Sequence, residues 1–146
     1  MPHLEDFLSS QEESEIVEAI RVAERSTSGE IRVHIEQDYD GDIYNHALEV
    51  FHYLKMDNTL ERNGVLIYVA VDNKAFVICG DKGINDKVGD DFWNSTRDKI
   101  QQHFKNGDFK DGLIGGIMEA GRVLSDYFPW NHGDRNELDN TISKGQ

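Results

Sequence analysis

The sequence NGVLIYVAVDNKAFVICG, at residues 63–80, contains the clearest strand signal of the chain. Its apolar run at residues 65–71 does not alternate with polar residues, which is typical of a strand that is covered on both faces. Asp72 and Asn73 separate this run from a second apolar run at residues 75–79, a spacing that suits a tight hairpin. We therefore expect a central strand followed by an antiparallel neighbour.

Upstream of the hairpin, the sequence predicts a strand and then a helix. Apolar and polar residues alternate over residues 31–36, as in a strand with one covered face. Apolar residues then recur at helical spacing between Ala47 and Leu54. A strand, a helix and a second strand form a βαβ unit, which crosses over right-handedly and places its two strands parallel.

Helices are also expected at both ends of this unit. Ser10 and Glu13 fit a capping box, and apolar residues follow them at helical spacing. Two further helices are predicted over residues 93–104 and 113–124. The aromatic residues of this region are interpreted as core, and they are Trp93, Phe104, Phe109 and Trp130.

The predicted fold class is α/β: a three-layer α/β/α sandwich whose small mixed sheet contains the βαβ unit and the β-hairpin, with helices on both faces. Gly115 and Gly116 lie inside the last helix, and we expect them to pack closely against the sheet. The length of 146 residues suits one domain. We assign this domain to residues 1–130, and residues 131–146 are expected to form a polar, loosely held C-terminal tail.

Charge and composition restrict the partners and the location. Lys and Arg total 15 and Asp and Glu total 28, so the net charge is −13 and nucleic acids are poor partners. No export signal is visible in residues 1–10, and no apolar run reaches the roughly 20 residues of a membrane span. Cys79 is the single cysteine, so no intramolecular disulfide can form. We expect a cytoplasmic monomer.

The region between residues 80 and 91 is rich in Gly, Asn and Asp. If the third strand is antiparallel, this region returns to the edge of the sheet where the first two strands begin. Carboxylate, amide and carbonyl oxygens are the ligands that calcium prefers. The candidate metal ligands at this edge are Glu30, Asn63, Asp81, Asn85, Asp86, Asp90 and Asp91.

The same Asp and Asn residues are also expected where a chain turns and where a helix around Trp93 begins. The region is not an EF-hand loop, because Asp86 stands where that loop needs Gly and Phe92 where it needs Glu.

A second acidic cluster follows the first strand, at the opposite edge of the sheet. Ligands of open α/β sheets usually bind outside the carboxyl ends of parallel strands, which favours this edge. A solvated acidic loop is the alternative interpretation. The residues of this cluster are Asp38, Asp40, Asp42 and Asp72.

No recognisable nucleophile or zinc motif stands out. The chain lacks a Gly-x-Ser-x-Gly elbow and a Walker loop. Cys79 ends a predicted strand, and we interpret it as a small buried residue. The histidines at 34, 46, 52 and 103 lack the spacing of a zinc-binding helix.

Several short motifs between residues 10 and 130 together resemble the TPM domain, which occurs in thylakoid-lumen acid phosphatase-like proteins and in many bacterial proteins. They are Ser28-Gly29-Glu30, Asn63-Gly64-Val65-Leu66, Gly80 to Gly83, Asp90, Gly107-Asp108-Phe109 and Gly112-Leu113. The resemblance implies an α/β/α sandwich, calcium binding in some members and the acid phosphatase activity proposed for plant members. Asn85 and Asp86 depart from the Glu and Gly that the family more often has there.

Together these observations predict a soluble, stand-alone bacterial-type TPM domain that binds a divalent cation. Calcium is the expected ion, with magnesium or another divalent cation as alternatives. We expect a regulatory or interaction module without its own catalysis. The alternatives are a metal-dependent acid phosphatase and a protein-interaction domain that recognises a protein partner.

Overall fold

The computed structural model describes residues 7–130, 138 and 140–145. The elements are α1 (Ser10–Ala23), β1 (Glu30–Glu36), α2 (Ile43–Tyr53), β2 (Gly64–Ala70), β3 (Ala75–Gly80), α3 (Lys82–Asn85), α4 (Asn94–Phe104), α5 (Phe109–Ser125) and β4 (Ser143–Lys144). None of the helices in this described part of the chain is long and apolar enough to cross a membrane.

The sheet is mixed, and its strand order is β3-β2-β1-β4. β1 pairs with β2 in parallel, and β2 pairs with β3 antiparallel. Every residue of β2 is buried, as the apolar run predicted. The predicted βαβ unit and β-hairpin are therefore confirmed.

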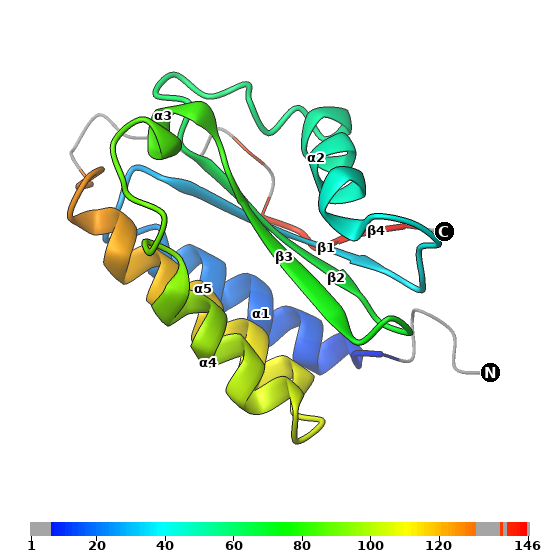
Figure 1. The fold of residues 1–146 in the computed structure, drawn as a ribbon. Helices are drawn as coiled ribbons and strands as arrows, with labels where there is room; N and C mark the ends of the chain where they lie inside the picture. Colours follow the sequence, from blue (N-terminus) through cyan, green and yellow to red (C-terminus); the bar gives the residue numbers. More distant parts are fainter. Residues whose placement is uncertain (1–6, 131–137, 139, 146) are drawn as a thin grey trace.

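Helices cover both faces of this sheet (Figure 1). α1, α4 and α5 lie on one face, where Ile31, Val33 and Ile67 belong to the larger core cluster. α2 lies on the other face, where Leu66 and Tyr68 belong to the smaller cluster. The predicted three-layer sandwich is confirmed.

Three local features differ from the sequence predictions. The capping box of α1 uses Ser9 and Glu12, one residue earlier than expected. The region after β3, expected to be a loop, begins with the short helix α3. The C-terminal tail contributes β4, which pairs in parallel with His34 and Ile35 of β1. Two paired residues are too short a segment to give a periodic strand signal.

The glycines of α5 pack against a helix rather than against the sheet. A Cβ atom at Gly116 would overlap the side chain of Ile100 on α4, and one at Gly112 would lie 2.6 Å from Phe104 Cδ1. Gly115 has open space around it, with Lys99 Cβ 3.8 Å from an added Cβ. The expected packing against the sheet was therefore wrong: Gly116 packs closely against α4, and Gly115 is not closely packed.

The aromatic residues were mostly placed correctly. Trp93, Phe104 and Phe109 are partly buried and pack against the larger core cluster. Trp130 is 44% exposed, so its interpretation as a core residue was wrong. It follows Pro129, where the helical pattern has already ended.

Candidate functional site

The amino edge of the sheet, where β1 and β2 begin, carries the first predicted cation site. Glu30 pairs with Gly64, and Gly64 is followed by Val65, which pairs with Gly80. Glu30, Gly64 and Asp81 therefore lie in one row across three strands, as the predicted chain direction required. Two strand spacings separate the outer residues by about 10 Å. Between them, a Cβ at Gly64 would lie 2.6 Å from the carbonyl oxygen of Met56.

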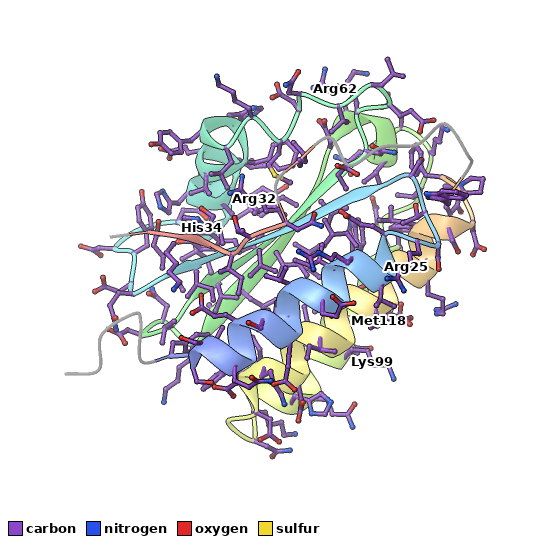
Figure 2. The ribbon with its side chains drawn as sticks, turned by 180° about the vertical axis from the view of Figure 1, so that it is seen from behind. Arg25, Arg32, His34, Arg62, Lys99 and Met118 are labelled. Carbon is purple, nitrogen blue, oxygen red and sulfur yellow. The ribbon has the colours of Figure 1, made fainter. Side chains whose placement is uncertain are left out.

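Asp81 is held by donors of the protein itself. Arg62 Nε donates to Asp81 Oδ2 at 3.0 Å and Arg62 Nη2 to Asp81 Oδ1 at 3.3 Å, and the Lys82 amide donates to Oδ1 at 2.7 Å. Asp81 is 5% exposed. The hydrogen bond and charge of Asp81 raise the pKa of Arg62. Figure 2 shows Arg62 above the sheet, on the side where α2 lies.

Glu30 also has a partner at this edge. Its Oε1 accepts a hydrogen bond from the Leu138 amide at 2.7 Å. Nearby, Glu24 Oε2 accepts from the Ile31 amide at 2.9 Å. Burial raises the pKa of Glu24 to about 8, and the charge of Glu30 adds to this effect. The two carboxyl groups therefore influence each other beside the start of β1.

Four of the remaining predicted ligands of the amino edge are exposed, Asn63 is buried, and most of the five are engaged. Asn85 Nδ2 donates to the Gly80 carbonyl at 3.1 Å, and Asp86 pairs with Lys82 at 2.9 Å. Asp91 accepts from Asn94 Nδ2 at 3.3 Å, whereas the structure gives Asp90 no hydrogen bond or ion pair with a described residue. Asn63 donates to Ser28 and Glu61.

Across residues 7–130, 138 and 140–145, no three His, Cys, Asp or Glu side chains are gathered so that they could hold a metal ion. The cation site at either edge therefore stays a prediction. Any ion that binds here must draw its ligands together, because the side chains stand apart in this structure.

At the carboxyl edge, the loop after β1 and the β2–β3 hairpin lie side by side, as predicted. The Tyr39 amide donates to Asn73 Oδ1 at 3.1 Å, and Asn73 Nδ2 donates back to the Tyr39 carbonyl at 2.9 Å. Gln37 Nε2 donates to Asp72 Oδ1 at 2.8 Å. Asp42 caps α2 by accepting from the Tyr44 amide at 2.9 Å. These bonds fix both ends of residues 37–42, which we call the acidic loop.

Asp38 and Asp40 differ from the other acidic residues of this edge. Both side chains are exposed. The structure gives neither carboxylate a hydrogen bond or an ion pair with a described residue. They flank Tyr39, whose backbone is held by Asn73 on both sides. The loop thus presents two unengaged carboxylates on a fixed backbone.

A polar cluster that the sequence analysis missed lies beneath this loop. Glu36 Oε2 accepts from Tyr68 Oη at 2.6 Å and from His46 Nε2 at 2.8 Å, and Glu36 Oε1 lies 3.1 Å from His34 Nε2. The other ring nitrogen of His34 lies 2.9 Å from Ser143 Oγ on β4. Figure 2 shows His34 beside the short strand β4. We call these residues the Glu36 cluster: His34, Glu36, His46, Tyr68 and Ser143.

The surroundings favour the charged form of Glu36 and the neutral forms of His34 and Tyr68. Burial alone would raise the pKa of Glu36, but the hydrogen bonds from Tyr68 and His34 outweigh it and lower that pKa. Burial lowers the pKa of His34. Burial and the bond to Glu36 raise the pKa of Tyr68. One partly buried carboxylate thus collects several donors, which offset the cost of removing its charge from water.

A signal for this cluster was present in the sequence. His34 and Glu36 are two residues apart on a strand, so their side chains share a face. Tyr68 pairs with His34 in the register of the sheet. Tyr39 stacks on His46, with ring centroids 3.8 Å apart, and thereby connects the cluster to the acidic loop. His34 and Glu36 follow the two-residue period of a strand, which differs from the helical spacing of a zinc site.

The mixed sheet with helices on both faces and an acidic carboxyl edge defines this chain as a small α/β sandwich domain. Residues 3–123 match the TPM domain, and the chain belongs to the TPM domain family. It is similar to the BA42 protein of the psychrophilic bacterium Bizionia argentinensis, with 60% sequence identity and a TM-score of 0.94 to its NMR structure. That match covers 99% of this chain and 100% of BA42.

More distant structures share the fold. The N-terminal domain of a protein from P. gingivalis is 22% identical, with a TM-score of 0.69 over 86% of this chain and 83% of that one. The N-terminal domain of cg2496 from Corynebacterium glutamicum is 14% identical, with a TM-score of 0.64 over 95% and 82%. No curated protein sequence matches this chain.

Proposed function

We propose that this protein binds a divalent cation, with calcium as the first candidate, through the acidic loop at the carboxyl edge of the sheet. The observation that carries the proposal is the pair Asp38 and Asp40: exposed carboxylates with no partner in the described residues, on a loop anchored by Tyr39 and Asn73. Magnesium or another divalent cation is the alternative ion.

The chemistry of the loop suits a hard cation. Asp38, Asp40 and Asp42 alternate along the chain, and calcium takes six to eight oxygen ligands from carboxylates, backbone carbonyls and water. Asp72 stands on the neighbouring hairpin, bonded to Gln37 of the same loop. The net charge of −13 raises the local concentration of any cation. Binding would draw the exposed side chains around the ion.

The amino edge is the weaker of the two sites. A cation there would have to displace Arg62 from Asp81, and Lys82 from Asp86. Arg62 holds a buried carboxylate through two hydrogen bonds, which is the strong form of such a pair. A metal ion gains little binding free energy from a carboxylate that already forms an ion pair with an arginine.

The biological role that we propose is a regulatory or interaction module. A metal-dependent acid phosphatase remains the alternative that the family resemblance implies, and no contact in the described residues specifically favours it. The cytoplasmic location, the monomeric state and a protein partner stay predictions.

Calcium titration followed by two-dimensional amide NMR tests the proposal at constant ionic strength. We expect the largest shifts at residues 37–43 and at Asp72 and Asn73, and we expect the Asp38→Asn/Asp40→Asn variant to lose them. The control variant, Asp90→Asn/Asp91→Asn, removes the same charge at the other edge and should keep them. Shifts confined to residues 80–91 would move the site to the amino edge, and no shifts at millimolar calcium would end the proposal.

A further inference from the structure

A pocket of about 530 Å³ lies on the face of the sheet that α4 and α5 cover, opposite the face that α2 covers. It lies where the β2–β3 hairpin, the end of α4 and the start of α5 meet. Small-molecule sites usually occupy roughly 300–1,000 Å³, so this pocket has room for a ligand. The residues that matter for its chemistry are Phe7, Lys74, Phe76, Phe104, Lys105 and Phe109.

Four phenylalanines form a connected aromatic wall. The rings of Phe7 and Phe109 lie 4.5 Å apart, those of Phe104 and Phe109 5.2 Å apart, and those of Phe76 and Phe104 5.5 Å apart. All four side chains are only partly buried and pack against the larger core cluster. The wall therefore offers apolar area to solvent, which an apolar ligand would cover.

The charged side chains that line the pocket are all positive. Lys74 and Lys105 line it, and both are exposed. Neither ammonium group has a hydrogen bond or an ion pair with a described residue. No Asp or Glu lines the pocket, although 28 of the 146 residues are acidic. A pocket with free cations and no carboxylate, in so acidic a protein, is complementary to an anion.

The backbone holds both lysines at the rim. Lys74 has φ of +53° in the hairpin turn, where its amide donates to the Val71 carbonyl at 3.1 Å. Lys105 caps the C-terminal end of α4. Gly107 follows in the α4–α5 turn, and a Cβ atom there would meet nothing within 4 Å. Gly107 lines the pocket and adds no side-chain bulk at the turn that follows Lys105.

We propose that this pocket binds a single-chain amphiphile with a carboxylate head, such as a medium-chain fatty acid. The tail lies along the four phenylalanine rings, and the carboxylate pairs with Lys74 and Lys105. The site is separate from the proposed cation loop, so either can exist without the other. A cationic amphiphile of the same length gains the apolar contacts but is repelled by both ammonium groups.

The test uses monomeric decanoate and decyltrimethylammonium, both far below the concentrations at which they form micelles, added to the full chain at neutral pH. Amide NMR should show saturable shifts for decanoate at Phe7, Phe76, Phe104, Gly107 and Phe109. The trimethylammonium ligand should bind at least about fivefold more weakly, since two exposed ion pairs are lost. Equal affinity for the two ligands, or no shifts in the pocket with millimolar decanoate, would overturn the proposal.

Two pairs of variants locate the site. Lys74→Gln/Lys105→Gln should raise the Kd for decanoate about fivefold, whereas Lys55→Gln/Lys99→Gln makes the same charge change outside the pocket and should leave the Kd unchanged. Gln101 lines the pocket, and its neighbour Gln102 does not. Gln101→Trp should therefore reduce binding while Gln102→Trp should not. If both members of either pair behave alike, the ligand binds elsewhere.

An anionic membrane surface is the competing source of an acyl tail beside a negatively charged head group. Vesicles of phosphatidylcholine with phosphatidylglycerol separate the two sources in a sedimentation assay. We expect decanoate to bind while the vesicles leave the protein in solution. Sedimentation with vesicles and no response to decanoate would contradict a pocket for a single amphiphile.

Discussion

Glu24 is the residue whose ionisation should most affect the stability of the fold. Its pKa is raised from 4.5 to about 8, chiefly by burial. Between these values the unfolded chain is ionised while the folded protein keeps the proton, so Glu24 stabilises the fold below pH 4.5 and this contribution is lost as the pH rises to about 8. The limiting slope is about 1.4 kcal/mol per pH unit.

Glu24→Gln should therefore flatten the fall of stability between these two pKa values. Glutamine keeps an acceptor for the Ile31 amide, so the variant should match or exceed the wild type near pH 8. Urea unfolding at several pH values measures this. Glu49→Gln, at an exposed position on α2, serves as the control and should keep the wild-type slope. An unchanged slope in Glu24→Gln would show that other groups cause the pH dependence.

Glu36 should be the costliest of the polar residues to neutralise. Glu36→Gln removes the charge, and its single carbonyl oxygen can serve Tyr68 and His46 only if its NH2 group turns toward His34. Hydrogen bonds to a charged group contribute roughly 1.5–3 kcal/mol each, so we expect a loss of about 3 kcal/mol in the free energy of unfolding. Urea unfolding at neutral pH, with Glu49→Gln again as the control, checks it. A loss below about 1 kcal/mol would contradict the central role of this carboxylate.

Among the elements, the contact between α4 and α5 depends on one glycine of an adjacent pair. Gly116→Ala should destabilise the protein by about 1–3 kcal/mol, because the new methyl group overlaps Ile100. Gly115→Ala should be neutral or stabilising by up to about 1 kcal/mol, because alanine favours the helix and has room there. Thermal unfolding of both variants tests the pair. Equal effects would mean that propensity, and not packing, explains the glycines.

β4 should be the element that responds to acid. The burial of His34 lowers its pKa from 6.5, so His34 stabilises the fold above that value and the contribution is lost as the pH falls below it. The positive charges of Arg32 and His46 oppose the charging of His34, and the charge of Glu36 favours it. A protonated Nδ1 can no longer accept from the Ser143 hydroxyl, which must then turn and accept from His34. The Gly145 amide, which donates to the Ile35 carbonyl at 2.8 Å, should lose hydrogen-exchange protection at low pH.

Comparison of Gly145 with an amide in the centre of β2 separates local release from global unfolding. We expect the protection factor of Gly145 to fall as the pH drops below 6.5 while that of the β2 amide stays higher. Parallel loss at both amides would mean that β4 does not open on its own.

The elements that the sequence predicted are those long enough for their apolar residues to show the period of a helix or a strand. The unbroken apolar run 65–71 predicted β2, because a strand that is buried on both faces shows no alternation of apolar and polar residues. The Asp72-Asn73 turn after this run predicted the antiparallel strand β3. β4 and α3 were missed, since two and four residues are too few to show a period. At the sites, the sequence placed Asp72 beside the acidic loop correctly. It could not show that Arg62, which is not one of the predicted ligands, forms an ion pair with Asp81.

For the whole molecule, the net charge of −13 makes every cation stabilising to some degree. Salt screens repulsion between surface carboxylates, so sodium chloride alone should raise the unfolding midpoint. A bound cation adds a term that depends on its affinity, because a ligand that binds only the folded state stabilises it by RT ln(1 + [L]/Kd). The two effects can be separated by ionic strength.

We expect about 10 mM calcium chloride to stabilise the wild type more than sodium chloride at the same ionic strength. At an occupancy of [L] = 10 Kd the excess would be about 1.4 kcal/mol. The Asp38→Asn/Asp40→Asn variant should lose this excess and keep the response to sodium chloride, whereas Asp90→Asn/Asp91→Asn should keep both. If calcium and sodium chloride act alike at matched ionic strength, the acidic surface attracts calcium only as a diffuse counterion. The carboxyl-edge site would then be wrong, while the fold and the phenylalanine-lined pocket would be unaffected.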